Sequence, residues 1–150
     1  GYEHRNMGLE RDVEKGTIST NPENHELMVR ARQAKIAQIA DSIPALQLIN
    51  AQQNKDVLLV GWGSTEGHLH AAANEMGCAL AQFNYICPLP RNTREVLSQY
   101  KRIIVCELNT GQFATYLRAQ FPEITFEQYN EIQGQPFAIE RIVNFVMNND

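Results

Sequence analysis

Two apolar runs without polar interruption constrain the fold more than any other feature of this sequence. One is Val57-Leu58-Leu59-Val60 and the other is Ile103-Ile104-Val105. Successive side chains of a strand point to opposite faces, so a strand without alternation must be covered on both faces. Central parallel strands of an α/β sheet meet that condition. We therefore predict that both runs lie inside such a sheet.

Other segments alternate between strand and helix patterns. Further strands are expected at residues 46–49, 79–83 and 125–129, with a polar turn at residues 52–55. Helices are expected after Thr65, at residues 92–100, at residues 111–121 and at the C-terminal end. In the last of these helices, one apolar stripe is formed by Ile139, Ile142, Val143, Val146 and Met147. This alternation predicts an α/β fold with an open, mostly parallel sheet and helices on both faces.

The N-terminal part has a different character. Residues 1–20 mix charges and glycines without apolar periodicity, which predicts a linker or arm, and residues 21–150 are expected to form the domain. Asn21-Pro22-Glu23 predicts a helix start. An apolar stripe follows at Ile36, Ile39, Ala40 and Ile43, before Pro44 closes the helix. We expect this helix to pack against another surface.

Composition excludes several classes of function. The chain has 150 residues, of which 43% are hydrophobic, enough for the core of one domain. A net charge of −4 gives no basic field for nucleic acid or anionic lipid, so neither partner is expected. No apolar run approaches the roughly 20 residues that cross a bilayer. The first residues resemble no signal peptide, and the chain is expected to be a piece of a longer protein.

The cysteines favour a reducing compartment. There are three, Cys78, Cys87 and Cys106, so one stays unpaired in any disulfide scheme, and the expected location is the cytoplasm. They contain no Cys-x-x-Cys pair, and the four histidines are scattered. We therefore expect no metal site or iron–sulfur cluster held by this chain alone.

The loop after the first apolar run is one of two candidate sites. It contains Gly61-Trp62-Gly63-Ser64-Thr65 and lies at the mouth of a predicted helix, where free backbone N–H groups can hold an anion. It resembles a dinucleotide fingerprint, but Gly67 comes one residue late and no acidic residue follows Phe83-Asn84, so an NAD site is not expected. The other interpretation is a tight turn in which Gly61 and Gly63 allow a close approach of the backbone. In that turn, Ser64 or Thr65 caps the helix and Trp62 packs on a neighbouring surface.

The second candidate is the loop Glu107-Leu108-Asn109-Thr110-Gly111-Gln112, which follows the second apolar run. Asn109 and Gln112 have capping-box spacing, as do Asn92 and Glu95 before an earlier predicted helix. Glu107 must be hydrogen-bonded, exposed in a crevice or paired with a cation, and a catalytic carboxylate would show the same pattern. If the strands are parallel, both loops lie at one edge of the sheet.

No residue is assigned a catalytic role, because the sequence lacks a nucleophile elbow, a Walker loop and a Gly-Asp-Gly thiamine motif. The candidate residues for contact with a ligand or a partner are Gly61, Trp62, Gly63, Ser64, Thr65, Glu107, Asn109, Gly111 and Gln112.

Several motifs, in this order, resemble one family. They are Gly1-Tyr2-Glu3-His4, Asn21-Pro22-Glu23-Asn24-His25 with Met28-Val29-Arg30-Ala31-Arg32, Val60-Gly61-Trp62-Gly63-Ser64-Thr65, Pro88-Leu89-Pro90, and Glu107-Leu108-Asn109-Thr110-Gly111-Gln112. Together they resemble the C-terminal part of the α subunit of 2-oxoglutarate:ferredoxin oxidoreductases. Arg5-Asn6-Met7 departs from the acidic residue expected there, and the residues before Gly16 lengthen the arm.

The resemblance implies a transketolase C-terminal-like domain that is mainly architectural. The complete complex would contain a β subunit, thiamine diphosphate and an iron–sulfur cluster, none of them held by this chain. The complex would convert 2-oxoglutarate and coenzyme A to succinyl-CoA and CO2 and pass electrons to ferredoxin. The alternative is an autonomous module that binds a phosphate or coenzyme A at residues 61–67.

Overall fold

The structure is a computed structural model that describes residues 8–51 and 54–148. The motif at residues 1–4, its departure at residues 5–7 and part of the predicted turn, residues 52 and 53, lie outside the described residues. Contacts divide the chain into two compact units, Gly1–Ser42 and Ile43–Asp150. This division differs from the predicted one, because it groups the first helix with the N-terminal residues rather than with the domain.

The N-terminal unit contains helix α1, Pro22–Ile39. The helix begins as predicted, since the Asn21 side chain accepts a hydrogen bond from the Asn24 N–H at 2.8 Å and Pro22 occupies the first turn. It buries no side chain, and Ile36 and Ile39 are 44% and 41% exposed. The predicted stripe is cut short, because the helix ends before Ala40.

Polar contacts hold residues before α1 against residues 24–32 of that helix. The Glu10 carboxylate lies 2.6 Å from His25 Nδ1 and 3.1 Å from Arg32 Nη1. The Asn24 side chain accepts from the Val13 N–H at 3.1 Å and donates to the Arg11 carbonyl at 2.8 Å. This unit is therefore ordered by side-chain hydrogen bonds rather than by an apolar core.

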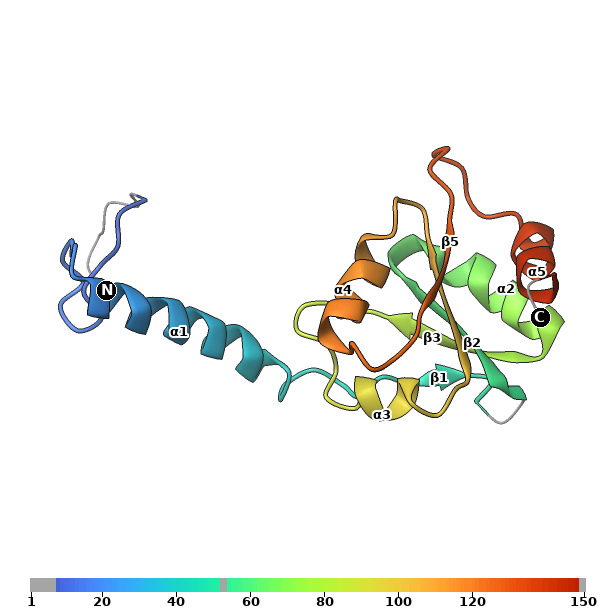
Figure 1. The fold of residues 1–150 in the computed structure, drawn as a ribbon, viewed down its shortest axis with the longest axis horizontal. Coiled ribbons are helices and arrows are strands. Elements are labelled where there is room, and N and C mark those ends of the chain that lie inside the picture. Colours follow the sequence, from blue (N-terminus) through green and yellow to red (C-terminus); the bar gives the residue numbers. More distant parts are fainter. Residues whose placement is uncertain (1–7, 52–53, 149–150) are drawn as a thin grey trace. The chain divides into compact units, whose positions relative to one another are not determined.

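The C-terminal unit is built on one sheet (Figure 1). Its strands are β1 (Leu48–Ile49), β2 (Asn54–Trp62), β3 (Cys78–Phe83), β4 (Arg102–Glu107) and β5 (Glu127–Asn130). The order is β1-β3-β2-β4-β5, with β1 antiparallel to β3 and the other pairs parallel. The predicted fold class is confirmed, and both apolar runs lie inside the sheet, with β2 at its centre.

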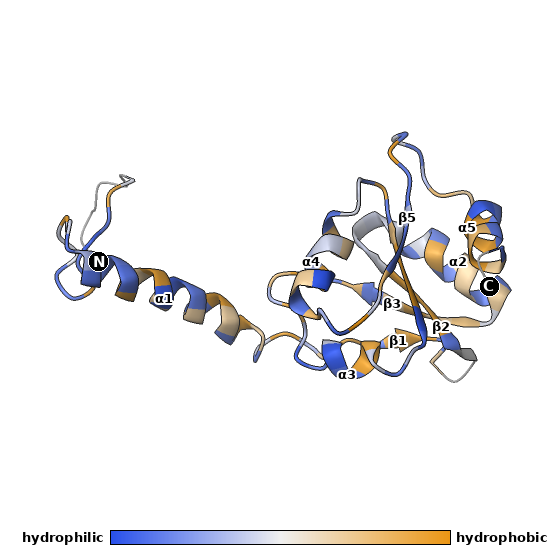
Figure 2. Cartoon of the chain, in the orientation of Figure 1, coloured by the Kyte–Doolittle hydropathy of each residue, from blue (hydrophilic) through white to orange (hydrophobic). Residues whose placement is uncertain are grey.

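Helices cover both faces of this sheet. They are α2 (Glu66–Met76), α3 (Thr93–Leu97), α4 (Gln112–Gln120) and α5 (Ile139–Met147). Leu58 and Val60 pack with residues of α3 and α4, whereas Leu59 packs on the opposite face with residues of α2 and α5. All three side chains are fully buried. Figure 2 shows the middle of β2 in the hydrophobic colour. Cover on both faces explains why this strand lacks polar alternation.

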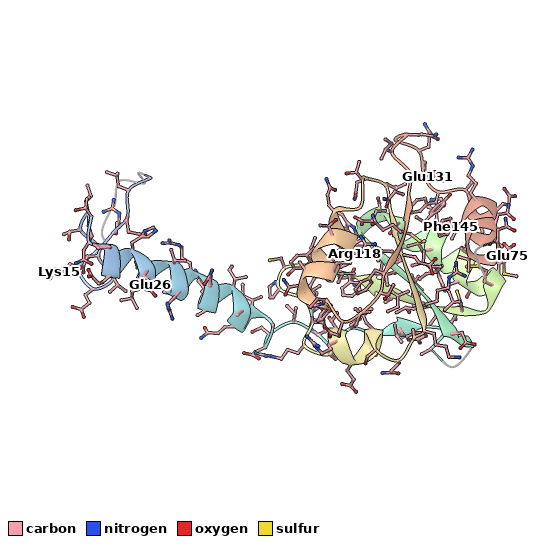
Figure 3. The ribbon with its side chains drawn as sticks, viewed as in Figure 1. Lys15, Glu26, Glu75, Arg118, Glu131 and Phe145 are labelled. Carbon is pink, nitrogen blue, oxygen red and sulfur yellow. The ribbon has the colours of Figure 1, made fainter. Side chains whose placement is uncertain are left out.

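The last strand is fastened to its neighbouring helix by Arg118, which is labelled in Figure 3. Its guanidinium donates to the Phe126 carbonyl at 2.6 Å and to the Gln128 side chain. On the other face, the ring of Phe145 lies 5.2 Å from that of Tyr129. In α5, the predicted stripe is buried at Ile142 and Val146, but Met147 is 61% exposed.

One local prediction is wrong. Asn92 was expected to cap the following helix together with Glu95, but its side chain makes no capping bond. Instead it accepts from the Leu46 N–H at 2.8 Å and donates to the Leu46 carbonyl at 3.0 Å. A partner 46 residues away has replaced the local one.

Among the residues described, none of the helices combines the length and the apolar character that a bilayer crossing requires.

Candidate functional site

The carboxyl ends of β2 and β4 lie side by side at the point where the strand order reverses. From β2 the chain passes through α2 to β3 on one side, and from β4 it passes through α4 to β5 on the other. The two strands pair in register, for example Val60 with Val105. In open α/β sheets the crevice beyond such a point is the usual site of ligand binding. Trp62 ends β2 at this point, and Glu107 ends β4.

Glu107 is fully buried and its carboxylate is completely engaged with its own chain. Oε1 accepts from the Ala114 N–H at 2.9 Å, and Oε2 accepts from the Phe113 N–H at 2.9 Å and from the Trp62 indole at 3.4 Å. Helix N-termini have unpaired N–H groups and a positive dipole end, so a carboxylate is stabilised there. Of the alternatives that the sequence left open, the structure shows the hydrogen-bonded one.

Trp62 is half-buried and is fixed at both its ring and its backbone. Its ring meets Phe113 edge to face, with centroids 6.3 Å apart and planes at 60°. The Thr65 hydroxyl donates to the Trp62 carbonyl at 2.9 Å and accepts from the Trp62 N–H at 3.2 Å. Thr65 therefore closes a short turn over residues 63–65. The prediction that its side chain caps α2 is wrong, because that side chain makes no capping hydrogen bond to the helix.

Two glycines of these loops leave no room for a side chain. A Cβ on Gly61 would lie 2.2 Å from Leu69 Cδ1 and 2.8 Å from Thr65 Oγ1, so the close approach predicted for Gly61 is confirmed. The same prediction is wrong for Gly63, because no atom lies within 4 Å of its Cβ position, although its φ of 61° favours glycine. Gly111 has a φ of 93°, and a Cβ there would lie 1.9 Å from Gln128 Nε2. Both positions exclude larger residues, Gly61 because of its packing and Gly111 because of both packing and backbone conformation.

Asn109 stabilises the second loop and the first N–H group of α4. Its side-chain oxygen accepts from the Gly111 N–H at 2.7 Å and from the Gln112 N–H at 3.1 Å. The bond to Gln112, three residues along the chain, is the one that the capping-box spacing predicts for Asn109, so this part of the prediction is confirmed. The capping position itself is Gly111, however, and Glu107 satisfies the two N–H groups that follow Gln112.

Trp62 lines two cavities. A cavity of about 150 Å³ is lined by Trp62, Gly63, Ser64, Thr65, Leu108 and Asn109. A more apolar one of about 330 Å³ is lined by Trp62, Ile86, Cys87, Gln112, Phe113 and Tyr116. The fold thus brings the two predicted loops together, with Trp62 shared between the cavities and Glu107 buried next to it. Neither Gly61 nor Gly111 is among the residues that line these two cavities.

The apolar cavity includes residues that the sequence did not single out. Phe113 and Tyr116 face it from α4, and Ile86 and Cys87 reach it from the loop after β3. The signal available was the i, i+3 spacing of the two aromatic residues, together with the position of Cys87 directly before the Pro88-Leu89-Pro90 motif. Burial raises the pKa of Tyr116, so its hydroxyl stays protonated at neutral pH.

The chemistry of the cysteines does not suit iron binding. Cys78 and Cys106 are buried, and burial raises the pKa of Cys78 to about 11 and also raises the pKa of Cys106. Metal ligation requires thiolates, whereas burial favours the neutral thiol at both positions in the metal-free fold. Over residues 8–51 and 54–148, His, Cys, Asp and Glu side chains form no group of three suited to a metal ion. The residues described therefore do not fit an iron–sulfur cluster.

Comparison with known proteins finds strong similarities, although no family model matches the chain. The chain is 38% identical to 2-oxoglutarate oxidoreductase subunit KorA of Mycobacterium tuberculosis over 97% of its own length and 23% of that protein. It is also 30% identical to a chain of 2-oxoglutarate:ferredoxin oxidoreductase from Magnetococcus marinus, whose structure was solved with 2-oxoglutarate, coenzyme A and succinyl-CoA bound. The two structures superimpose with a TM-score of 0.83, and the match covers 97% of this chain and 26% of the other. The resemblance predicted from the motifs is confirmed. The chain spans about a quarter of each relative.

Proposed function

We propose that this chain is a non-catalytic assembly domain of a 2-oxoglutarate:ferredoxin oxidoreductase. The assembled enzyme would convert 2-oxoglutarate and coenzyme A to succinyl-CoA and CO2 and reduce ferredoxin in the cytoplasm. The observation that carries the proposal is coverage: two oxidoreductase chains match 97% of this chain, while the chain accounts for 23% and 26% of them. Most of the catalytic protein therefore lies in other segments of such a subunit, or in partner chains.

The site geometry supports a structural role rather than a catalytic one. Glu107 is the buried carboxylate at the point where the strand order reverses, and its oxygens already accept three hydrogen bonds from this chain. A general base must reach a substrate proton, and this carboxylate is turned inward. In the complex, thiamine diphosphate and the iron–sulfur cluster would be held by other domains, including the β subunit.

Trp62 is the residue best placed to contact a partner. Its backbone and indole N–H are fixed by Thr65 and Glu107, while part of its ring borders two open cavities. Partly exposed aromatic residues held rigidly beside an apolar recess are typical interface anchors. We propose that this edge of the sheet faces another domain or the β subunit, with Trp62 at the centre of the contact.

The test replaces Trp62 with Ala in the complete subunit and measures its association with the β subunit. Removing an anchor of this type costs about 2–4 kcal/mol, so we expect association at least about thirtyfold weaker. Met147→Ala is the matched control, because Met147 is 61% exposed and lines neither of the cavities beside Trp62. It lies in the last turn of α5, where the Val146 carbonyl accepts from Arg102 at the start of β4, away from the carboxyl ends of the strands. Unchanged association of the Trp62 variant, with a large loss of melting temperature, would contradict the interface role.

The autonomous coenzyme A or phosphate module is distinguished by a separate measurement. A ligand that binds only the folded state raises the melting temperature, by an amount that depends on its concentration relative to its Kd. We expect coenzyme A and inorganic phosphate to leave the melting temperature of this chain unchanged. In the part of the chain that the structure describes, no Lys, Arg or His lines either cavity beside Trp62.

A further inference from the structure

The second half of helix α1 has no part in the site described above, although the sequence predicts that this helix packs against a surface. Every residue from 31 to 39 is exposed, so within the described part of the N-terminal unit no face of these turns is covered. Two large apolar side chains, Ile36 and Ile39, are among them. Burying their apolar area would be favourable, which makes this stretch a candidate contact surface.

The two isoleucines belong to a regular face of the helix. His25, Val29, Arg32, Ile36 and Ile39 follow one another at alternating intervals of four and three residues. In an α-helix such positions form one nearly straight line along the helix, and two helices pack against each other along lines of this kind. We call this face the α1 seam. Its apolar half consists of the two isoleucines.

The arm before α1 occupies the other half of the seam. The Glu10 carboxylate lies 2.6 Å from His25 Nδ1 and 3.1 Å from Arg32 Nη1, and both of these residues belong to the seam. The contacts of the arm end at Arg32, and the same face continues uncovered along the apolar half. The chain therefore supplies a partner for the polar half of the seam only.

The charge of this stretch indicates the chemistry of the missing surface. From residue 27 to residue 40 the charged residues are Arg30, Arg32 and Lys35, all of them basic. The two arginines are paired with Glu26 and Glu10, whereas Lys35 forms no ion pair with the residues described. Lys35 lies four residues before the second isoleucine, so it stands beside the apolar half of the seam. A complementary surface is apolar and carries carboxylates at its edge.

The two relatives indicate where such a surface is found. Each match covers 97% of this chain, which leaves too few residues unmatched to omit a helix of 18 residues. The chain accounts for 23% and 26% of these proteins, so most of each relative is polypeptide that can cover the helix. A second copy of α1 packed in parallel is disfavoured, because Arg32 and Lys35 would face their own counterparts.

We propose that the apolar half of the α1 seam packs on a helix in another segment of the same oxidoreductase subunit, along an apolar stripe flanked by acidic side chains. This inference rests on the function proposed above, because it requires the longer subunit. The arm and that segment then cover successive halves of one helix face. Helix α1, which buries no side chain in this chain, thereby joins the domain to the rest of the subunit.

The experiment compares backbone hydrogen exchange of α1 in the isolated 150-residue chain and in the complete subunit. Covering the two isoleucines should slow the exchange of residues 33–39 in the complete subunit by about tenfold or more. Ile36→Gln should remove that slowing. Leu27→Gln is the matched control, because Leu27 is 49% exposed and lies nine residues before Ile36, on the opposite face of the helix. The control variant should retain the slowing.

The charge is tested separately at Lys35. Beside carboxylates, Lys35→Glu places like charges together, so it should reduce the slowing more than Lys35→Gln does. A smaller effect of the Glu variant, or equal effects of both, overturns the acidic chemistry of the partner.

Three results overturn the packing itself. They are equal exchange in the isolated chain and the complete subunit, slowing that persists in Ile36→Gln, and slowing in the isolated chain that grows with its concentration, which would assign the surface to a second copy. The proposed function is tested by association with the β subunit and by ferredoxin reduction. Both can succeed while α1 exchanges equally fast in the two proteins, so the two proposals fail separately.

Discussion

Helix α1 is 18 residues long and buries none of its side chains, whereas strand β3 has six residues and buries all of them. The difference follows from what each element packs against. Strand β3 lies between β1 and β2 with helices over both faces, while α1 is held by polar contacts that end at Arg32. An isolated helix of this length is marginal in water. The C-terminal unit thus contains its own source of stability, and the N-terminal unit has little of its own.

The largest effect should come from the sheet core. Ile104→Ala removes a fully buried side chain from β4, and we expect a loss of about 3–4 kcal/mol in the free energy of unfolding. Ile36→Ala, at a 44% exposed position of α1, is the matched control and should change that free energy by less than about 0.5 kcal/mol. Urea unfolding measures both, and comparable losses would show that α1 is as well packed as the sheet.

The next effect concerns the carboxylate that joins the two loops. Glu107→Leu leaves two N–H groups of α4 and the indole of Trp62 without an acceptor, and we expect a loss of about 2–4 kcal/mol. Glu107→Gln keeps one acceptor oxygen and should lose less.

Glu123, an exposed partner of Arg94, provides the control for this carboxylate. Glu123→Gln should change the free energy of unfolding by no more than about 1 kcal/mol, because an exposed ion pair contributes little. Equal losses for the Glu107 and Glu123 variants in urea unfolding would contradict the structural role of Glu107.

A smaller and more local effect is expected at Asn92. Asn92→Ala removes both hydrogen bonds to Leu46, and we expect a loss of about 1–2 kcal/mol together with faster hydrogen exchange of the Leu46 amide. Asn92→Asp retains the acceptor and should protect that amide more than Ala does. If the amide exchanges equally slowly in all three proteins, the proposed contact is not what protects it.

The smallest effect is a pH dependence confined to the N-terminal unit. The hydrogen bond from Arg32, followed by that from His25, lowers the pKa of Glu10 below its ordinary value of 4.5. A lowered pKa in the folded state means that the contact stabilises this unit above pH 4.5 and is lost as the pH falls through the lowered value. The Val13 amide signal should report this transition, and Glu10→Gln should abolish it while the unfolding of the sheet stays unchanged.

The sequence predicted what depends on burial and misjudged what depends on distant polar partners. The apolar run Val57 to Val60 determines its own environment, because a strand without polar alternation is stable only when it is covered on both faces. Asn92 was assigned to a neighbouring helix because short-range patterns contain no information about Leu46, which lies 46 residues earlier.

The candidate site shows the same limit. Its two loops were expected at one edge of the sheet, because the carboxyl ends of parallel strands meet there, and they do lie together around Trp62. The role of Glu107 could not be chosen from sequence, since a buried capping carboxylate and a catalytic one follow an apolar strand in the same way.

The pairing of Asn92 with Leu46 also bears on aggregation. Strand β1 has only two residues and forms one edge of the sheet, and an exposed edge offers free N–H and carbonyl groups to the strands of other molecules. The carboxamide of Asn92 occupies both backbone groups of Leu46, as a neighbouring peptide group would. One side chain thereby removes a docking point for an intruding strand, and its loss should make this chain more prone to self-association during refolding.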